Sequence, residues 1–129
     1  MDVTIGATLT GGSTATLTPA GISPGKSTFV GPDHSILEPE TVDFTFTAPR
    51  TTATDPGVSR TGMKVTFASR TDVEGCCTVQ SGAVIVDLGV RWSLNQPDTL
   101  VDSVLSYLKG LVYTTEFSDA VKKGVLPQA

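Results

Sequence analysis

The chain has 129 residues, 39% of them hydrophobic and 17% charged, with 13 glycines and 8 prolines. This length predicts one domain, residues 1–129, and excludes a second lobe around a large substrate cleft. A formal net charge of −4 excludes a general polyanion binder, so a nucleic-acid site must be a local patch. No leader is recognised and no apolar run approaches the roughly 20 residues of a membrane span, so we expect a soluble, unprocessed protein without a membrane partner.

The N-terminal part of the sequence is rich in threonine and glycine. Residues 3–9 and 14–18 have strand-like composition, and Gly11 and Gly12 between them suit a tight turn. We therefore predict a β-hairpin over about residues 3–18. Proline and glycine pairs then predict a turn-rich connector that contains one short strand at 27–30.

Three later segments, 41–47, 63–70 and 83–94, alternate between apolar and polar residues. The segments between them, 50–60 and 71–78, are predicted to be loops. Such alternation is typical of an antiparallel sheet that is covered on one face and wet on the other. The sheet is expected over about residues 27–94, with a polar partner on its wet face. The polar side chains of that face are Asp43, Thr45, Lys64, Thr66, Asp87 and Arg91.

Two helices are predicted at about 97–124, after the last strand. Apolar residues between Leu100 and Val112 recur at i, i+3 and i+4, and Gly110 is expected to weaken or end this first helix. Thr114 or Thr115 can cap the second. Strands followed by helices indicate an α+β fold. Because the link from strand to helix is so short, we expect the first helix to cover a partner's sheet.

Four short strings in this order carry a family resemblance: TLTPAGISPG at 16–25, E-x-V-x-F-x-F-x-A-P at 40–49, MKVTF at 63–67 and VDLGVRWS at 86–93. With them, nearly the whole chain resembles the coat (capsid) protein of single-stranded RNA bacteriophages, the levivirus family, and is most similar to its Qβ-type branch. No single string is diagnostic. Their order and spacing together carry the resemblance.

The resemblance implies an N-terminal hairpin, a five-stranded antiparallel sheet and two C-terminal helices. It also implies an obligate, intertwined homodimer with a ten-stranded sheet, in which each subunit's helices cross onto the other's sheet. Dimers would assemble in the bacterial cytoplasm into the icosahedral shell of a virion that packages single-stranded genomic RNA, with a maturation protein as a further partner. The residues expected at the dimer interface are Val86, Leu88, Val90, Trp92, Leu100, Val104, Leu105 and Leu108.

The resemblance implies that the wet face lines the interior of the shell, where it binds genomic RNA and a stem-loop that acts as translational operator. Lys64 matches a family lysine of that face, and Thr45, Thr66 and Asp87 fall on positions that contact the stem-loop. Arg91 can neutralise a phosphate, and Asp43 lies on the same face. Ile85 is a departure, because relatives of this branch carry there a tyrosine that stacks on a base. The alternative is that the basic residues only pair with Asp43 and Asp87 across strands.

Cys76 and Cys77 are adjacent in the 71–78 loop, and adjacent cysteines make a strained disulfide with each other. In relatives, cysteines of this loop cross-link neighbouring subunits around the symmetry axes, so inter-subunit disulfides are implied, with two free thiols as the alternative. His34 is the sole histidine, and no metal or cofactor site is expected. No catalytic spacing is recognised, and we expect no enzyme activity.

Three classes of protein remain compatible with the sequence. The resemblance favours a self-assembling coat protein that packages RNA. The other two are a monomeric β-rich binding or adhesion module without an RNA role, and a small thiol enzyme that uses Cys76 or Cys77. Particle formation separates the first class from the other two.

Overall fold

The computed structural model describes residues 1–5, 13–68, 70–72, 75, 78–80 and 82–128. The chain divides into two compact units. The first comprises Met1–Val3 and Thr14–Leu94, and the second comprises Thr4–Ser13 and Asn95–Ala129. Gly11, Gly12, Cys76 and Cys77 lie outside the described residues.

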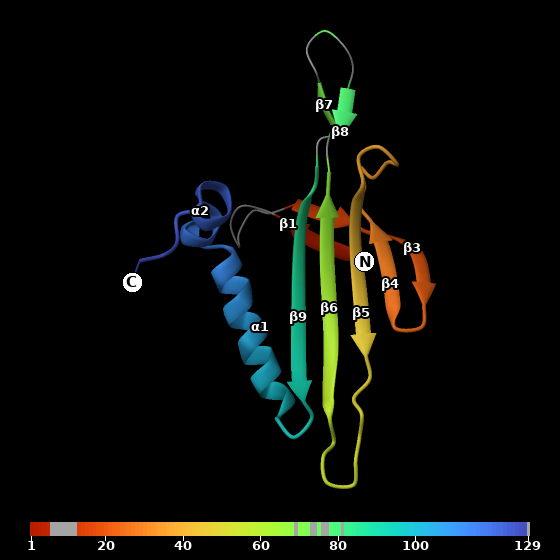
Figure 1. Cartoon of the computed structure of the whole chain (residues 1–129), viewed down its shortest axis with the longest axis vertical. Helices are drawn as coiled ribbons and strands as arrows, with labels where there is room; N and C mark the ends of the chain where they lie inside the picture. Colours follow the sequence, from red (N-terminus) through yellow and green to blue (C-terminus); the bar gives the residue numbers. More distant parts are fainter. Residues whose placement is uncertain (6–12, 69, 73–74, 76–77, 81, 129) are drawn as a thin grey trace. The chain divides into compact units, whose positions relative to one another are not determined.

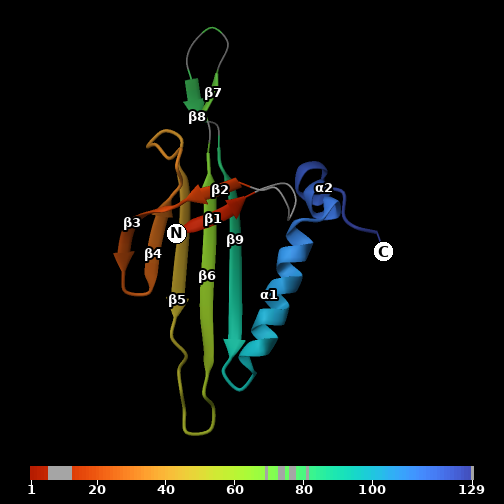
Figure 2. The same cartoon turned by 180° about the vertical axis from the view of Figure 1, so that it is seen from behind.

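The first unit is built on a five-stranded antiparallel sheet (Figures 1 and 2). Its strands follow one another in space as β3, β4, β5, β6 and β9, so each connection joins neighbours. Two smaller strand pairs are β1 with β2 and β7 with β8. The bounds are β1 Asp2–Ile5, β2 Ser13–Thr16, β3 Thr18–Ser23, β4 Lys26–Val30, β5 Glu40–Thr47, β6 Val58–Phe67, β7 Arg70–Asp72, β8 Thr78–Gln80 and β9 Val84–Ser93.

The sheet begins at β3, in a stretch that the sequence predicted to be a connector. Pro24 and Gly25 form the turn into β4, and Gly25 has a φ of 76° that suits glycine. β3 is an edge strand, where a proline without an N–H is tolerated, and its pairing with β4 is irregular between Pro19 and Gly21. The predicted five-stranded sheet is confirmed, with β3 as the strand that alternation alone did not reveal.

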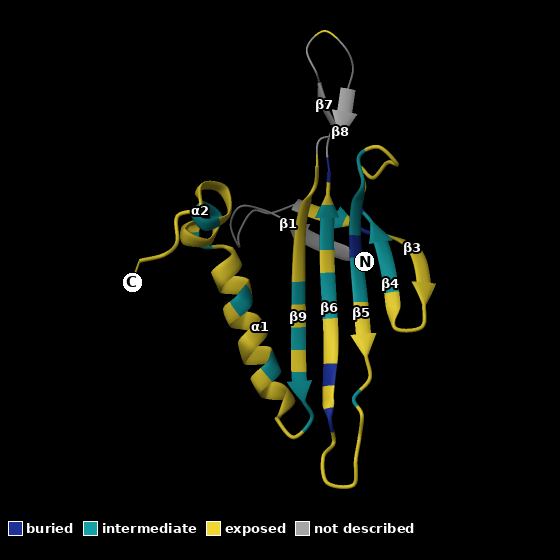
Figure 3. Ribbon diagram, in the orientation of Figure 1, coloured by how far each residue is buried: buried dark blue, intermediate teal, exposed yellow. Residues whose placement is uncertain are grey.

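The apolar face of the sheet carries the alternate residues expected from the sequence, but its core is thin (Figure 3). Val42 is buried there, and the Phe29 and Phe44 rings meet edge to face with centroids 5.9 Å apart. Leu17 and Ala68 are the other buried apolar side chains among the described residues. Toward β9 the same face is open, because Val84 and Val86 are exposed.

The helices of the second unit are α1 (Asp98–Val112) and α2 (Thr115–Lys123). Pro97 precedes α1, and the helix continues through Gly110, where the sequence predicted weakening or an end. The Thr114 hydroxyl caps α2 by accepting from the Phe117 backbone N–H at 3.2 Å. Gly124 ends α2 with a φ of 68°. Neither described helix is both long and apolar enough to cross a membrane.

Candidate nucleic-acid interface

The polar face of the sheet is a grid of side chains, because directly opposed residues of antiparallel strands point to the same side. Its rows run across β5, β6 and β9, and β4 extends three of them. From one end to the other the rows are Val30, Thr41, Thr66 and Ile85; Thr28, Asp43, Lys64 and Asp87; Lys26, Thr45, Gly62 and Gly89; and Thr47, Arg60 and Arg91.

The seven residues that the sequence placed at an RNA site therefore lie on one face. They come from β5, β6 and β9 and occupy all four rows. Their binding role stays a prediction. The grid also shows two basic residues that the sequence reasoning missed, Lys26 and Arg60.

Lys64 stands at the centre of the face, between Asp43 on β5 and Asp87 on β9. Within the described part of the chain, Lys64 forms no ion pair within 4.0 Å. An ion pair within this distance joins Lys123 to Asp119 in α2. The Asp43 carboxylate accepts a hydrogen bond from the Thr28 hydroxyl at 2.6 Å. The alternative was that Lys64 only pairs with Asp43 and Asp87 across the strands. No ion pair of this kind is present among the described residues.

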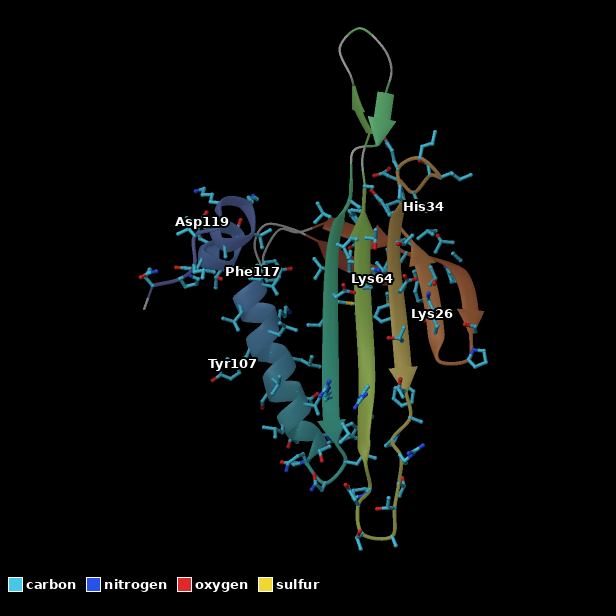
Figure 4. The ribbon with its side chains drawn as sticks, viewed as in Figure 1. Lys26, His34, Lys64, Tyr107, Phe117 and Asp119 are labelled. Carbon is cyan, nitrogen blue, oxygen red and sulfur yellow. The ribbon has the colours of Figure 1, made fainter. Side chains whose placement is uncertain are left out.

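A hollow of about 250 Å³ lies around Lys64, and Figure 4 shows this residue on β6 and Lys26 on β4. Lys26 is directly opposite Thr45, so it lies on the same polar face as Lys64. The predicted strand at 27–30 began one residue too late to include Lys26, because β4 starts directly after the turn at Pro24 and Gly25. The lining residues are Lys26, Asp43, Thr45, Gly62, Met63, Lys64, Asp87 and Leu88.

Arg60 was assigned to a loop from the sequence, yet β6 begins at Val58. Arg60, Gly62 and Lys64 occupy alternate positions of β6, so they share one face of the strand. Extending this alternation back from Lys64 would have predicted Arg60 on the polar face. Its direct neighbour on β9 is Arg91. The two arginines line a second hollow on the same face.

Ile85 occupies the first row, and its side chain is 51% exposed. The four rows contain no aromatic residue among the described positions. A base that meets this face therefore finds an aliphatic surface at Ile85 and no ring on which to stack.

The residues predicted at a dimer interface come from β9 and α1. β9 is the last strand of the sheet and has β6 as its one neighbour among the described strands. On β9, Val86 is 52% exposed, and on α1, which has no buried residue, Val104 is 57% exposed. The predicted disulfide residues, Cys76 and Cys77, lie outside the described residues.

His34 lies in the exposed turn between β4 and β5, labelled in Figure 4. The Nδ1 of His34 accepts a hydrogen bond from the Glu40 backbone N–H at 3.0 Å, and the backbone N–H of His34 donates to the Gly31 carbonyl at 3.2 Å. These bonds tie the turn together, which gives the histidine a structural role. Within the described residues, no group of three His, Cys, Asp or Glu side chains is placed to hold a metal ion.

Known proteins resemble this chain through its structure, since no family model and no curated protein matches the sequence. Among solved structures, the virus-like particle of Beihai levi-like virus 32 is 12% identical, with a TM-score of 0.78 over 89% of this chain and 90% of that chain. The particle of Beihai levi-like virus 21 is 19% identical, with a TM-score of 0.76 over 99% and 97%. The bacteriophage GA protein capsid is 14% identical, with a TM-score of 0.65 over 95% and 93%.

These likenesses extend over nearly the whole of each chain and include both the sheet and the helices. They come from several viruses, so similarity to the Qβ-type branch stays a prediction. The fold predicted from the sequence is confirmed: this chain has the fold of the levivirus-type coat protein.

Proposed function

We propose that this chain is a structural capsid protein that assembles as homodimers into an icosahedral shell around single-stranded RNA. The particles with which it shares its fold support the capsid role. The proposal places the protein in a virion, with the polar face of the sheet toward the RNA. We further propose that this face binds an RNA stem-loop, through which the protein represses translation.

The observation that carries the proposal is the position of β9 at the edge of the sheet. β9 is ten residues long, β6 is the one described strand that pairs with it, and Val84 and Val86 are exposed. A long apolar edge is a template for pairing with another chain, and pairing with its own copy about a two-fold axis closes the edge. A second sheet added in this way makes the ten-stranded sheet of the predicted dimer.

The helices supply the second part of the argument. Leu100, Val104 and Leu105 form an apolar stripe on α1, and all three are exposed. Fully burying one such side chain contributes about 1.5–3 kcal/mol. A partner subunit that covers this stripe and the open part of the sheet would gain several such contributions, which favours an obligate dimer.

The RNA role rests on local charge. Four basic side chains, Lys26, Arg60, Lys64 and Arg91, share the polar face with two acidic ones, Asp43 and Asp87. The face is therefore positive although the chain carries a formal charge of −4. Basic and hydroxyl side chains are the groups that contact phosphates, and a carboxylate can accept from a base amine.

Expression in bacteria followed by size-exclusion chromatography and electron microscopy tests the capsid role. We expect hollow shells that elute far ahead of a monomer and contain RNA protected from added nuclease. Particles without protected RNA would contradict the packaging role and leave the capsid role standing. A clean monomer would overturn the capsid role and favour a monomeric binding module.

A further inference from the structure

Two arginines are directly opposed on the polar face, Arg60 on β6 and Arg91 on β9. Side chains at such positions start about 4.5–5.5 Å apart, and like charges there destabilise a sheet. Both are exposed, and neither lies within 4.0 Å of a carboxylate in the described part of the chain. Folding thus brings two positive charges together, and no carboxylate of the described residues forms an ion pair with either of them.

Two glycines lie beside this pair of arginines on the polar face. Gly62 and Gly89 are directly opposed in the next row. A Cβ added at Gly89 would meet nothing within 4 Å, whereas one added at Gly62 would clash with the Thr45 hydroxyl oxygen at 2.5 Å. The Thr45 hydroxyl therefore fills the room over Gly62, and the room over Gly89 stays open.

The result is a hollow of about 630 Å³ with donors around it. Each guanidinium presents planar N–H groups that match the oxygens of a phosphate, and the threonine hydroxyls can donate as well. Six of the residues that line it belong to the polar rows: Thr45, Thr47, Arg60, Gly62, Gly89 and Arg91.

We propose that Arg60 and Arg91 together clamp one phosphate group of the RNA backbone over Gly89. This inference rests on the proposed RNA role of the face and adds a site to it. The negative phosphate offsets the repulsion of the two guanidiniums, so binding stabilises the sheet at the same place. Gly89 lets the phosphate approach the backbone, which a larger side chain at this position would prevent.

The salt dependence of RNA binding measures how many phosphates the pair neutralises. We would replace Arg60→Gln, Arg91→Gln and both together in the full chain, and titrate an unstructured oligouridylate at several salt concentrations. Each phosphate that the protein neutralises on a single strand releases counterions and contributes about −0.7 to the slope of log K against log salt. A shared phosphate predicts a total loss of about 0.7 in the double variant, whereas two separate phosphates predict about 1.4. A loss near 1.4 would overturn sharing, and an unchanged slope would overturn the site.

Matched variants separate this site from the face as a whole. Arg50→Gln removes an exposed arginine that precedes β6 and lies outside the four rows, and it should leave the slope unchanged. Lys64→Ala should lower the slope, since Lys64 lies at the centre of the face. If Lys64→Ala has its effect and the arginine variants have none, the clamp is wrong and the RNA role stands. If none of them has an effect, the RNA role fails.

Thermal unfolding of RNA-free protein provides a second readout. Arg60→Gln should raise the melting temperature at low salt, because it removes the repulsion from Arg91. A merely structural role for Arg60 predicts a lower melting temperature instead, and that result would overturn the proposal. Adding inorganic phosphate tests whether the site binds a free anion or the phosphate of the RNA backbone. If it raises the melting temperature of the wild type while the arginine variants bind oligouridylate normally, the site takes small anions and its assignment to RNA is wrong.

Discussion

At the scale of single residues, the positive charge of Lys64 stays available for a ligand although acidic side chains lie on both neighbouring strands. Carboxylates flank it on both neighbouring strands, yet Thr28 engages Asp43 and no ion pair within 4.0 Å holds the lysine among the described residues. Exposed ion pairs contribute only about 0–1 kcal/mol. In the proposed RNA-binding role, exchanging such weak attraction for a phosphate contact would therefore cost little.

Ile85 is the residue at which the face departs from the family pattern. Because stacking of a base on an aromatic ring contributes about 1–3 kcal/mol, Ile85→Tyr should tighten the binding of an RNA stem-loop with unpaired bases by about tenfold. Filter binding at one salt concentration measures the change. Ile85→Leu is the control, since it preserves an aliphatic surface of similar volume and should leave affinity within about twofold.

A fully paired RNA of the same length distinguishes stacking from a general effect. It offers no unpaired base, so Ile85→Tyr should leave its affinity unchanged. Equal tightening of both RNAs would show that the tyrosine acts without base stacking. No change for either RNA would place Ile85 outside the binding surface.

At the scale of elements, the two edge strands of the sheet differ in what they expose. β3 is irregular and carries one proline, Pro19, and one glycine, Gly21, whereas β9 is long and continuous and has exposed apolar side chains beside it. Irregularity and proline are common ways to prevent unwanted pairing at an edge. The sheet is therefore closed to strand addition at one edge and open at the other.

This difference predicts opposite outcomes for two similar substitutions. Val86→Glu should abolish the dimer, because burying an unpaired carboxylate in the interface costs several kcal/mol. Ile22→Glu is the control, since Ile22 lies on β3 and is 80% exposed. Light scattering coupled to size exclusion gives the mass, and circular dichroism checks the fold. A Val86→Glu protein that remains dimeric would remove the open part of β9 from the interface.

The sequence indicated the elements whose signal is periodic. Strict alternation located β5 and β9, and the i, i+3, i+4 stripe with the Thr114 cap located the helices. β3 and the start of β6 were missed, because Pro19, Pro24 and Gly57 are turn residues in isolation. Pairing with β4 and with β9 overrides that local preference, and such pairing is not local information. The six polar residues predicted for the wet face and Ile85 do lie on one face, and their role in RNA binding stays a prediction. The prediction lacked Lys26, which lies one residue before the predicted strand 27–30, and Arg60, which lies in the predicted loop 50–60.

At the scale of the whole molecule, the proposed packaging of RNA by an acidic chain requires that basic and acidic side chains lie on different elements. The polar face of the sheet has more basic than acidic side chains. The helices have the reverse excess, with Asp98, Asp102, Glu116 and Asp119 against Lys109, Lys122 and Lys123. A shell with the sheet inward and the helices outward then presents positive charge to RNA and negative charge to solvent. A net charge away from zero also keeps assembled particles apart in solution.

The cysteines carry the last prediction, which concerns the complete shell. Cys76 and Cys77 are adjacent, and a disulfide between neighbouring residues is strained, so we expect each to bond to a neighbouring subunit once the particle leaves the reducing cytoplasm. Each such bond stabilises by about 2–4 kcal/mol. Oxidised shells should therefore release RNA at a higher temperature than shells treated with dithiothreitol, and should give ladders of linked subunits on non-reducing gels.

The variant with both Cys76→Ser and Cys77→Ser is the matched control, because serine has nearly the shape of cysteine and cannot form a disulfide. It should assemble normally, since subunit pairing through β9 and α1 does not involve this loop in the proposed dimer. Its heat release should no longer respond to dithiothreitol and should equal that of the reduced wild type. If oxidised wild-type shells run as single subunits on non-reducing gels, the cysteines are free thiols, and the strength of the shell then comes from non-covalent contacts alone.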